Sequence, residues 1–324
     1  MQVFEEFVTP ITPYLICDHY IATELRLHKG ETVDGYPCLF DTSNPNARPL
    51  DVKISANDLL KNQNYSTIKN LDIVQCQFLR FEYFFSNVLP FLKKNNIKII
   101  LLTSQDHAPA LTRSDMTDKC LNDENIILWI SQNPIYCNHE KYMAFPYGIR
   151  QYSVAKYADF VRKKDIKKSN TILNLRASAW GHLPDNHIRK KYDIFGKDST
   201  TPTGPTGVGA YDNFLNRIST TKFLISTGGD RDDCYRHYES IGLGAVPVSN
   251  IRYKEIFGDN MIYSDADEMV DMVTSGKVPY RYNRPNKEII TVRYWKHEIN
   301  KRFNKVTRNP GYLKYCLQPA AENT

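Results

Sequence analysis

Short, unbroken apolar runs separated by helix-sized stretches are the feature that most limits the folds open to this chain. Residues 97–103 contain the run IILL, and residues 126–130 read IILWI, each flanked by polar turn formers. Such runs are typical of parallel strands that are buried on both faces. Between them, residues 78–94 repeat apolar side chains at intervals of three and four, which predicts a helix. Strands and helices that alternate in this way predict an α/β fold built on parallel sheets.

The alternation occurs twice, with a break near residue 150 after the turn-forming PYG sequence. Before the break we predict strands and helices at 72–75, 78–94, 97–103, 114–121, 126–130 and 142–145. After the break we predict them at 154–168, 171–175, 186–192, 211–219, 222–226, 234–243, 245–249, 261–263 and 267–275. We therefore expect two doubly wound domains, 1–150 and 151–285. A last helix at 287–305, within the segment 286–324, is expected to cross back to the first domain.

Composition indicates a folded protein without a membrane anchor. The 324 residues are 41% hydrophobic and 24% charged, which excludes a disordered or fibrous chain. No apolar run approaches the roughly 18 residues that a membrane span needs, and the N-terminal MQVFEEFVTP lacks the features of a signal peptide. The seven cysteines are scattered and odd in number, which fits a reducing cytoplasm. The net charge of +6 allows a polyanionic partner without arguing for one.

The segment 223–248, FLISTGGDRDDCYRHYESIGLGAVPV, carries the clearest chemical signal. An apolar strand runs into Thr227, Gly228 and Gly229, and a helix follows. In such sheets, ligands bind at the carboxyl ends of strands, where glycines let a phosphate approach a helix N-terminus. On the helix, Arg236 and Glu239 are three residues apart and share a face. A guanidinium suits a diphosphate, and a carboxylate can accept hydrogen bonds from ribose hydroxyls.

A purely structural interpretation of the same residues remains open. Asp232 or Asp233 could cap the helix and pair with Arg236, which would leave Glu239 in solvent. Such a surface pair contributes only about 0.3 to 0.5 kcal/mol.

The spacing Asp233-x-x-Arg236-x-x-Glu239, followed by the sequence GAVPV at 244–248, resembles the signature of the exostosin-like glycosyltransferases. Three weaker segments, 98–111, 127–134 and 144–149, also resemble that family. The chain departs from the family pattern around the glutamate, where Tyr238 and Ser240 replace the usual aromatic, often Trp, and Ala. Both replacements keep the residue class or size, so they affect packing detail alone.

The resemblance implies a GT-B architecture, with two Rossmann-like domains that face each other across a cleft. The C-terminal domain would hold a nucleoside-diphosphate sugar, UDP-sugar first among the candidates, and the N-terminal domain would hold the acceptor. Arg236 would contact the diphosphate and Glu239 the ribose, with the 227–229 turn and Asp233 beside them. The expected enzyme is a cytoplasmic hexosyl- or pentosyltransferase of the soluble microbial or viral type, inverting and without a cofactor or metal.

Further residues are candidates for the same reaction. Arg176 and Arg189 could add positive charge at the diphosphate. A base on the acceptor side is needed for inversion, and Asp106, in the loop after the strand at 97–103, is the first choice, with His107 beside it. Asp18, next to His19, is the second candidate for this base. The structural alternative for Asp106 is an Asx turn or a helix cap.

Three alternatives to this interpretation remain. The sequence DRD at 230–232 spells the D-x-D motif that holds a divalent metal in the GT-A architecture, although a metal site needs ligands from more than one segment. The acceptor could be a modified base in DNA, since basic stretches at 156–168, 189–191, 280–284 and 293–296 could follow a phosphate backbone. The chain could also be a non-catalytic nucleotide- or sugar-binding module with a vestigial motif.

Overall fold

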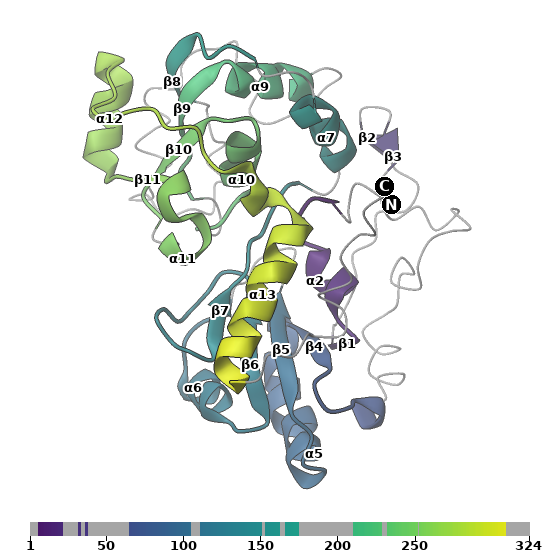
Figure 1. Ribbon diagram of the computed structural model, residues 1–324. Helices are drawn as coiled ribbons and strands as arrows, with labels where there is room; N and C mark the ends of the chain where they lie inside the picture. Colours follow the sequence, from purple (N-terminus) through teal and green to yellow (C-terminus); the bar gives the residue numbers. More distant parts are fainter. Residues whose placement is uncertain are drawn as a thin grey trace. The chain divides into compact units, whose positions relative to one another are not determined.

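The computed structural model describes residues 6–21, 32–33, 36–37, 65–104, 111–150, 153–162, 166–174, 210–228, 232–251 and 253–308. The chain divides into two compact units (Figure 1). Unit 1 comprises Met1–Val33, Pro37–Pro146 and Val292–Thr324, and unit 2 comprises Asp34–Tyr36 and Tyr147–Thr291. The two largest parts of this division change unit after residues 146 and 291, and the predicted domains 1–150, 151–285 and 286–324 stay a prediction. The assignment of an acceptor side and a donor side to the two units stays a prediction.

Unit 1 is built on a five-stranded parallel sheet with the order β1-β4-β5-β6-β7. Its strands are β1 (His19–Ile21), β4 (Ile73–Gln77), β5 (Ile99–Ser104), β6 (Ile126–Ser131) and β7 (Tyr142–Ala144). All six residues of β5 are buried, as the apolar run predicts. A separate two-stranded sheet pairs β2 (Thr32–Val33) with β3 (Tyr36–Pro37).

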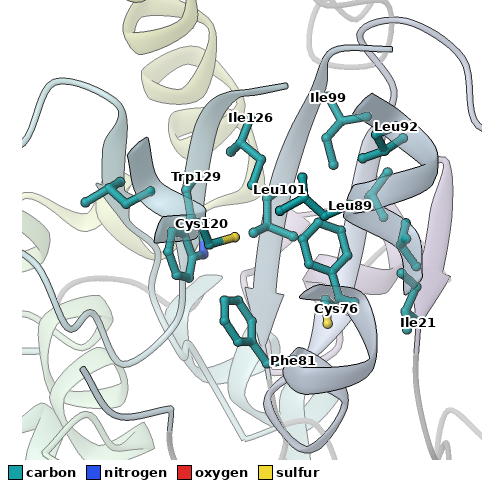
Figure 2. Packing of buried hydrophobic residues seen from close by; sticks show 14 of the residues in the cluster. Ile21, Cys76, Phe81, Leu89, Leu92, Ile99, Leu101, Cys120, Ile126 and Trp129 are labelled. Atoms are coloured by element: carbon teal, nitrogen blue, oxygen red, sulfur yellow. The ribbon is translucent and has the colours of Figure 1, made fainter. Parts of the chain in front are cut away.

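The core of unit 1 lies between this sheet and the helices that connect its strands (Figure 2). Phe81 stacks on Trp129 of β6, with ring centroids 5.3 Å apart, and Leu101 and Cys120 complete the centre of the cluster. No described residue of α2 (Thr12–Ile16) or α13 (Val292–Thr307) belongs to this cluster, and the two helices pack against β4, β5 and β6. Helices therefore cover both faces of the sheet.

Two predicted helices are interrupted. The stretch predicted as one helix at 78–94 is a 3-10 turn (Phe78–Arg80), α4 (Phe81–Tyr83), a π-helical turn (Phe84–Val88) and α5 (Leu89–Lys94). Pro90 explains the π turn, because it has no N–H to bond the carbonyl four residues earlier. The C-terminal helix begins at Val292, after a separate 3-10 turn at Lys287–Ile290, because Thr291 is extended.

Unit 2 contains a second parallel sheet with the order β11-β10-β9-β8. Its strands are β8 (Asn170–Asn174), β9 (Thr221–Ile225), β10 (Val246–Ser249) and β11 (Ile262–Tyr263). Its helices are α7 (Val154–Arg162), α9 (Ala210–Ser219), α10 (Tyr235–Gly242), α11 (Lys254–Phe257) and α12 (Ala266–Ser275). Unit 1 adds α6 (Asp115–Asn122), which Ser114 caps through a capping box.

Both units are thus α/β structures on separate parallel sheets, consistent with two Rossmann-like domains. The described strands of each sheet follow one another in chain order, without the reversal that defines a doubly wound sheet. Without a strand-order reversal, the edge of each sheet where a ligand is expected to bind is the one formed by the carboxyl ends of its strands. The helix predicted at 154–168 ends too late, since residues 166–168 are not helical, and α11 was not predicted. The helix predicted at 186–192 lies outside the described residues.

Candidate functional site

The candidate site in unit 2 lies where β9 ends and α10 begins. The apolar residues of β9 are buried, and the chain continues through Ser226, Thr227 and Gly228. Residues 229–231, which include the predicted site residue Gly229 and the first part of the D-x-D motif, lie outside the described residues. Asp233 and the N-cap residue Cys234 then lead into α10. The junction therefore lies at the carboxyl edge of the sheet, where ligands bind in folds of this class.

Asp233 is held by hydrogen bonds within unit 2. The side chain is 2% exposed, and its Oδ2 accepts from the Tyr147 backbone N–H at 2.9 Å and from the Tyr238 hydroxyl at 2.7 Å. Burial raises its pKa to about 7, while His237 and the two hydrogen bonds oppose the shift. Asp233 thus ties the start of α10 to the turn at Tyr147. The Tyr238 hydroxyl donates to this carboxylate, a contact that a tryptophan could not make in the same way.

The raised pKa of Asp233 gives a prediction for stability against pH. The folded protein keeps a proton that the unfolded chain, with an Asp pKa of about 3.9, releases. The stabilisation is therefore fully present below about pH 4 and is lost as pH rises through about 7. Relative to Asp233→Asn, which cannot titrate, the wild type should lose roughly 3 to 4 kcal/mol of unfolding free energy between pH 4 and pH 8.

Urea unfolding of both proteins at several pH values measures this difference. The amide introduced by Asp233→Asn keeps an oxygen that can accept the two hydrogen bonds, so the variant is expected to fold. Parallel pH profiles for the wild type and the variant would contradict the assignment.

His237, which sequence reasoning missed, is fully buried beneath the same junction. Its Nε2 lies 3.1 Å from the Asp232 carbonyl oxygen, which can only accept, so Nε2 carries the hydrogen. In the neutral ring, Nδ1 then accepts from the Ser226 hydroxyl at 2.7 Å. The thiol of Cys234 lies 3.4 Å from Nε2. The ring therefore links the end of β9 to the residues before α10.

Glu239 is also buried, at 1% exposure. Its Oε1 accepts a hydrogen bond of 2.8 Å from the Tyr211 hydroxyl of α9. Burial raises the pKa of Glu239, and Arg150, Tyr211 and Arg236 lower it in turn. The open alternative in which Glu239 is solvated is therefore wrong. A buried carboxylate whose pKa responds to the charges of two arginines is the kind of group that binds a polar ligand at a functional site.

Arg236 and Glu239 lie on the same helix, and a second arginine acts on the same carboxylate. Arg150 has its guanidinium 5.5 Å from the centroid of the Tyr235 ring, and Tyr235 stacks on Tyr147 with centroids 4.9 Å apart. Sequence reasoning assigned the second positive charge to Arg176 or Arg189, both of which lie outside the described residues. Arg150 follows the PYG turn directly, and only the fold reveals its position near α10.

Packing around α10 fixes the backbone of this motif. Tyr157 of α7 is fully buried, and its hydroxyl donates to the carbonyl oxygens of Glu239 at 3.0 Å and Tyr238 at 3.3 Å. The Glu239 carbonyl also accepts from the Leu243 N–H at 3.2 Å, so the Tyr157 hydroxyl adds a second donor to it. The helix that carries Arg236 and Glu239 is therefore anchored from α7 as well as from α9.

The candidate bases in unit 1 have different outcomes. Asp106 and His107 lie outside the described residues and stay predictions. Asp18 precedes β1, and its Oδ2 accepts from the backbone N–H of Ile73 at 2.9 Å. His19 pairs with Asp72 at 2.9 Å. Asp18 and His19 therefore lie at the amino edge of the sheet, opposite the edge where substrates bind, which argues against Asp18 as the base.

Two lysines of the basic stretch 156–168, which was proposed to follow DNA phosphates, make contacts inside unit 2 instead. Lys156 is buried and pairs with Asp212 at 2.9 Å. Lys168 donates to the carbonyl oxygen of Leu243 at 2.7 Å. Neither amine is therefore available to a phosphate backbone, which weakens the DNA alternative.

The spacing of His139, His182 and His187 in the sequence does not suit a metal site and predicts surface or cap residues. In the structure His139 accepts from the Lys141 N–H in a turn, while His182 and His187 lie outside the described residues. In the described part of the chain, no group of three His, Cys, Asp or Glu residues could hold a metal ion. Over the same residues, no helix has the length and apolar character needed to cross a membrane.

No protein-family model matches this chain, and no curated protein matches it. The resemblance to exostosin-like glycosyltransferases therefore stays a prediction based on the motif in α10 and its surroundings.

Proposed function

We propose that this protein is a glycosyltransferase that moves a sugar from a nucleoside-diphosphate sugar to a hydroxyl of a carbohydrate acceptor. The observation that carries the proposal is the buried Glu239, on a helix at the carboxyl edge of a parallel sheet. It accepts a hydrogen bond from Tyr211, and the charges of Arg150 and Arg236 lower its pKa against the effect of burial. UDP-sugars are the first donor candidates. We further propose the GT-B arrangement, with the donor bound by unit 2 and the acceptor by unit 1.

In this proposal Arg236 and Arg150 neutralise the diphosphate that leaves as the glycosidic bond breaks. A planar guanidinium suits this task because it stays charged and donates several hydrogen bonds in one plane. Glu239 accepts from a ribose hydroxyl, and Gly228 lets the backbone approach the phosphates. Asp106, with His107 beside it, is proposed to take the proton from the acceptor hydroxyl in an inverting reaction that needs no metal.

A thermal-shift screen against UDP-, GDP-, dTDP- and CMP-sugars tests the proposal. A ligand present at 100 times its Kd should stabilise the folded protein by about 2.7 kcal/mol. We expect one nucleotide class to raise the unfolding temperature. The free sugar should not reproduce that shift, because it lacks the diphosphate. No shift with any of the four at millimolar concentration would contradict the proposal.

A further inference from the structure

Three buried amide residues lie in the carboxyl half of the unit 1 sheet, on β4 and directly after β6. Gln75 of β4 and Gln132, just after β6, are fully buried, and Asn133 is 4% exposed. Gln75 donates to the Ser104 hydroxyl, at the end of β5, at 3.0 Å. Thr103 pairs with Ser131 across the sheet, and the Gln132 N–H donates to the Thr103 carbonyl, so Ser104 and Gln132 are neighbours. Gln75 and Gln132 therefore flank β5, with Ser104 between them.

Several polar atoms of this amide cluster have no protein partner. The Nε2 of Gln132 donates to the Pro146 carbonyl at 3.1 Å. A carbonyl only accepts, so this bond identifies Nε2 of Gln132 as the donor and leaves its Oε1 as an acceptor. In the described structure, Oε1 of Gln132, Oε1 of Gln75 and both side-chain atoms of Asn133 make no hydrogen bond. Buried polar atoms without partners cost stability and call for an explanation.

Asn133 has a second unusual property, because its backbone is left-handed, with φ of +47°. Asparagine is among the few residues that adopt this conformation readily. The turn therefore accounts for an Asn or Gly here, but it does not account for a buried amide whose oxygen and nitrogen both lack partners. A ligand that offers hydroxyl groups would satisfy both atoms.

The chemistry of the cluster selects the kind of ligand. The neighbouring side chains on the same face of the sheet, Ser104 and Gln77, are uncharged. Amide oxygens accept hydrogen bonds, and they repel the oxygens of a phosphate, which are acceptors as well. Hydroxyl groups can both donate and accept. We propose that Gln75, Gln132 and Asn133 form a binding site for a neutral, hydroxyl-rich carbohydrate and that this carbohydrate is the acceptor. Its role as acceptor rests on the function proposed above.

Saturation-transfer NMR with a panel of p-nitrophenyl glycosides tests this site in the full-length protein, without a nucleotide sugar. We expect at least one neutral glycoside to bind and p-nitrophenyl phosphate not to compete. Asn133→Gly keeps the left-handed turn and removes the amide, and it should weaken glycoside binding about tenfold. Asn138→Gly is the matched control, since Asn138 is also left-handed, with φ of +56°, but is exposed.

Gln75→Met is a second variant, which removes polar atoms at similar volume and should also weaken binding. Thermal unfolding of each variant verifies that it folds. The inference is overturned if no glycoside binds, if Asn133→Gly and Gln75→Met bind as the wild type does, or if p-nitrophenyl phosphate competes for the site. Asn133-dependent glycoside binding, together with failure of every nucleotide sugar in the thermal-shift screen, would support the carbohydrate site and reject the proposed transferase function.

Discussion

Gly242→Ala should destabilise unit 2 by about 2 to 4 kcal/mol. Gly242 is the last residue of α10, and a Cβ added there would lie 1.9 Å from Tyr157 Oη and 2.5 Å from Ile290 Cδ1. The tip of Ile290 can move aside. Tyr157 cannot do so freely, because its ring is fully buried and its hydroxyl donates to the carbonyls of α10. Urea unfolding measures the loss.

Gly276→Ala is the control for this variant. Gly276 caps α12 with φ of +66° and has no atom within 4 Å of a built Cβ, so the variant should cost only the backbone penalty of about 1 to 2 kcal/mol. In the double variant Tyr157→Phe/Gly242→Ala the hydroxyl oxygen is gone, and the ring atom closest to the new Cβ is Cζ of residue 157, at 3.1 Å. The double variant should therefore be more stable than the sum of the single effects predicts. Wild-type stability of Gly242→Ala would contradict the packing of α7 on α10.

Arg236→Ala should lower kcat/KM for sugar transfer by about 10² to 10³, the usual effect of removing one group that stabilises charge in a transition state. The negative charge on the diphosphate grows as the glycosidic bond breaks, and the guanidinium on α10 is proposed to meet it. Because Arg236 is only half-buried, the fold should tolerate the loss. Steady-state kinetics with the donor found by the thermal-shift screen gives the value.

Arg281→Ala provides the comparison, because Arg281 is an exposed arginine of the same unit. It removes the same charge from the protein without touching α10 and should leave kcat/KM within about twofold of wild type. Wild-type activity of both Arg236→Ala and Arg281→Ala would remove Arg236 from the mechanism. An equal loss in both would indicate that net charge, and not a specific contact, determines the rate.

The sequence predicts the sheets well because their strands are continuous apolar runs, and β5, β6, β9 and β10 each lie within two residues of the predicted bounds. The interruptions at Pro90 and Thr291 were missed, because apolar periodicity continues through both positions. Local spacing also predicts that Arg236 and Glu239 share a face of α10, and the structure has both residues on that helix.

The partners of the motif could not be predicted, because they come from distant parts of the chain. Tyr211 lies 28 residues before Glu239, and the Tyr147 N–H lies 86 residues from Asp233. Helical spacing carries no information about such contacts. Nothing in the sequence around His237 marks it as a buried residue, and its hydrogen bond to Ser226 appears only in the structure.

Hydrogen exchange measured by mass spectrometry, with and without the nucleotide sugar found by the thermal-shift screen, tests the central claim most directly. The claim is that unit 2 binds the donor at the junction of β9 and α10. It predicts slower amide exchange in peptides that cover residues 226–240 when donor is present, and loss of that protection in Arg236→Ala. Protection confined to unit 1, or unchanged exchange in these peptides at saturating donor, would contradict it.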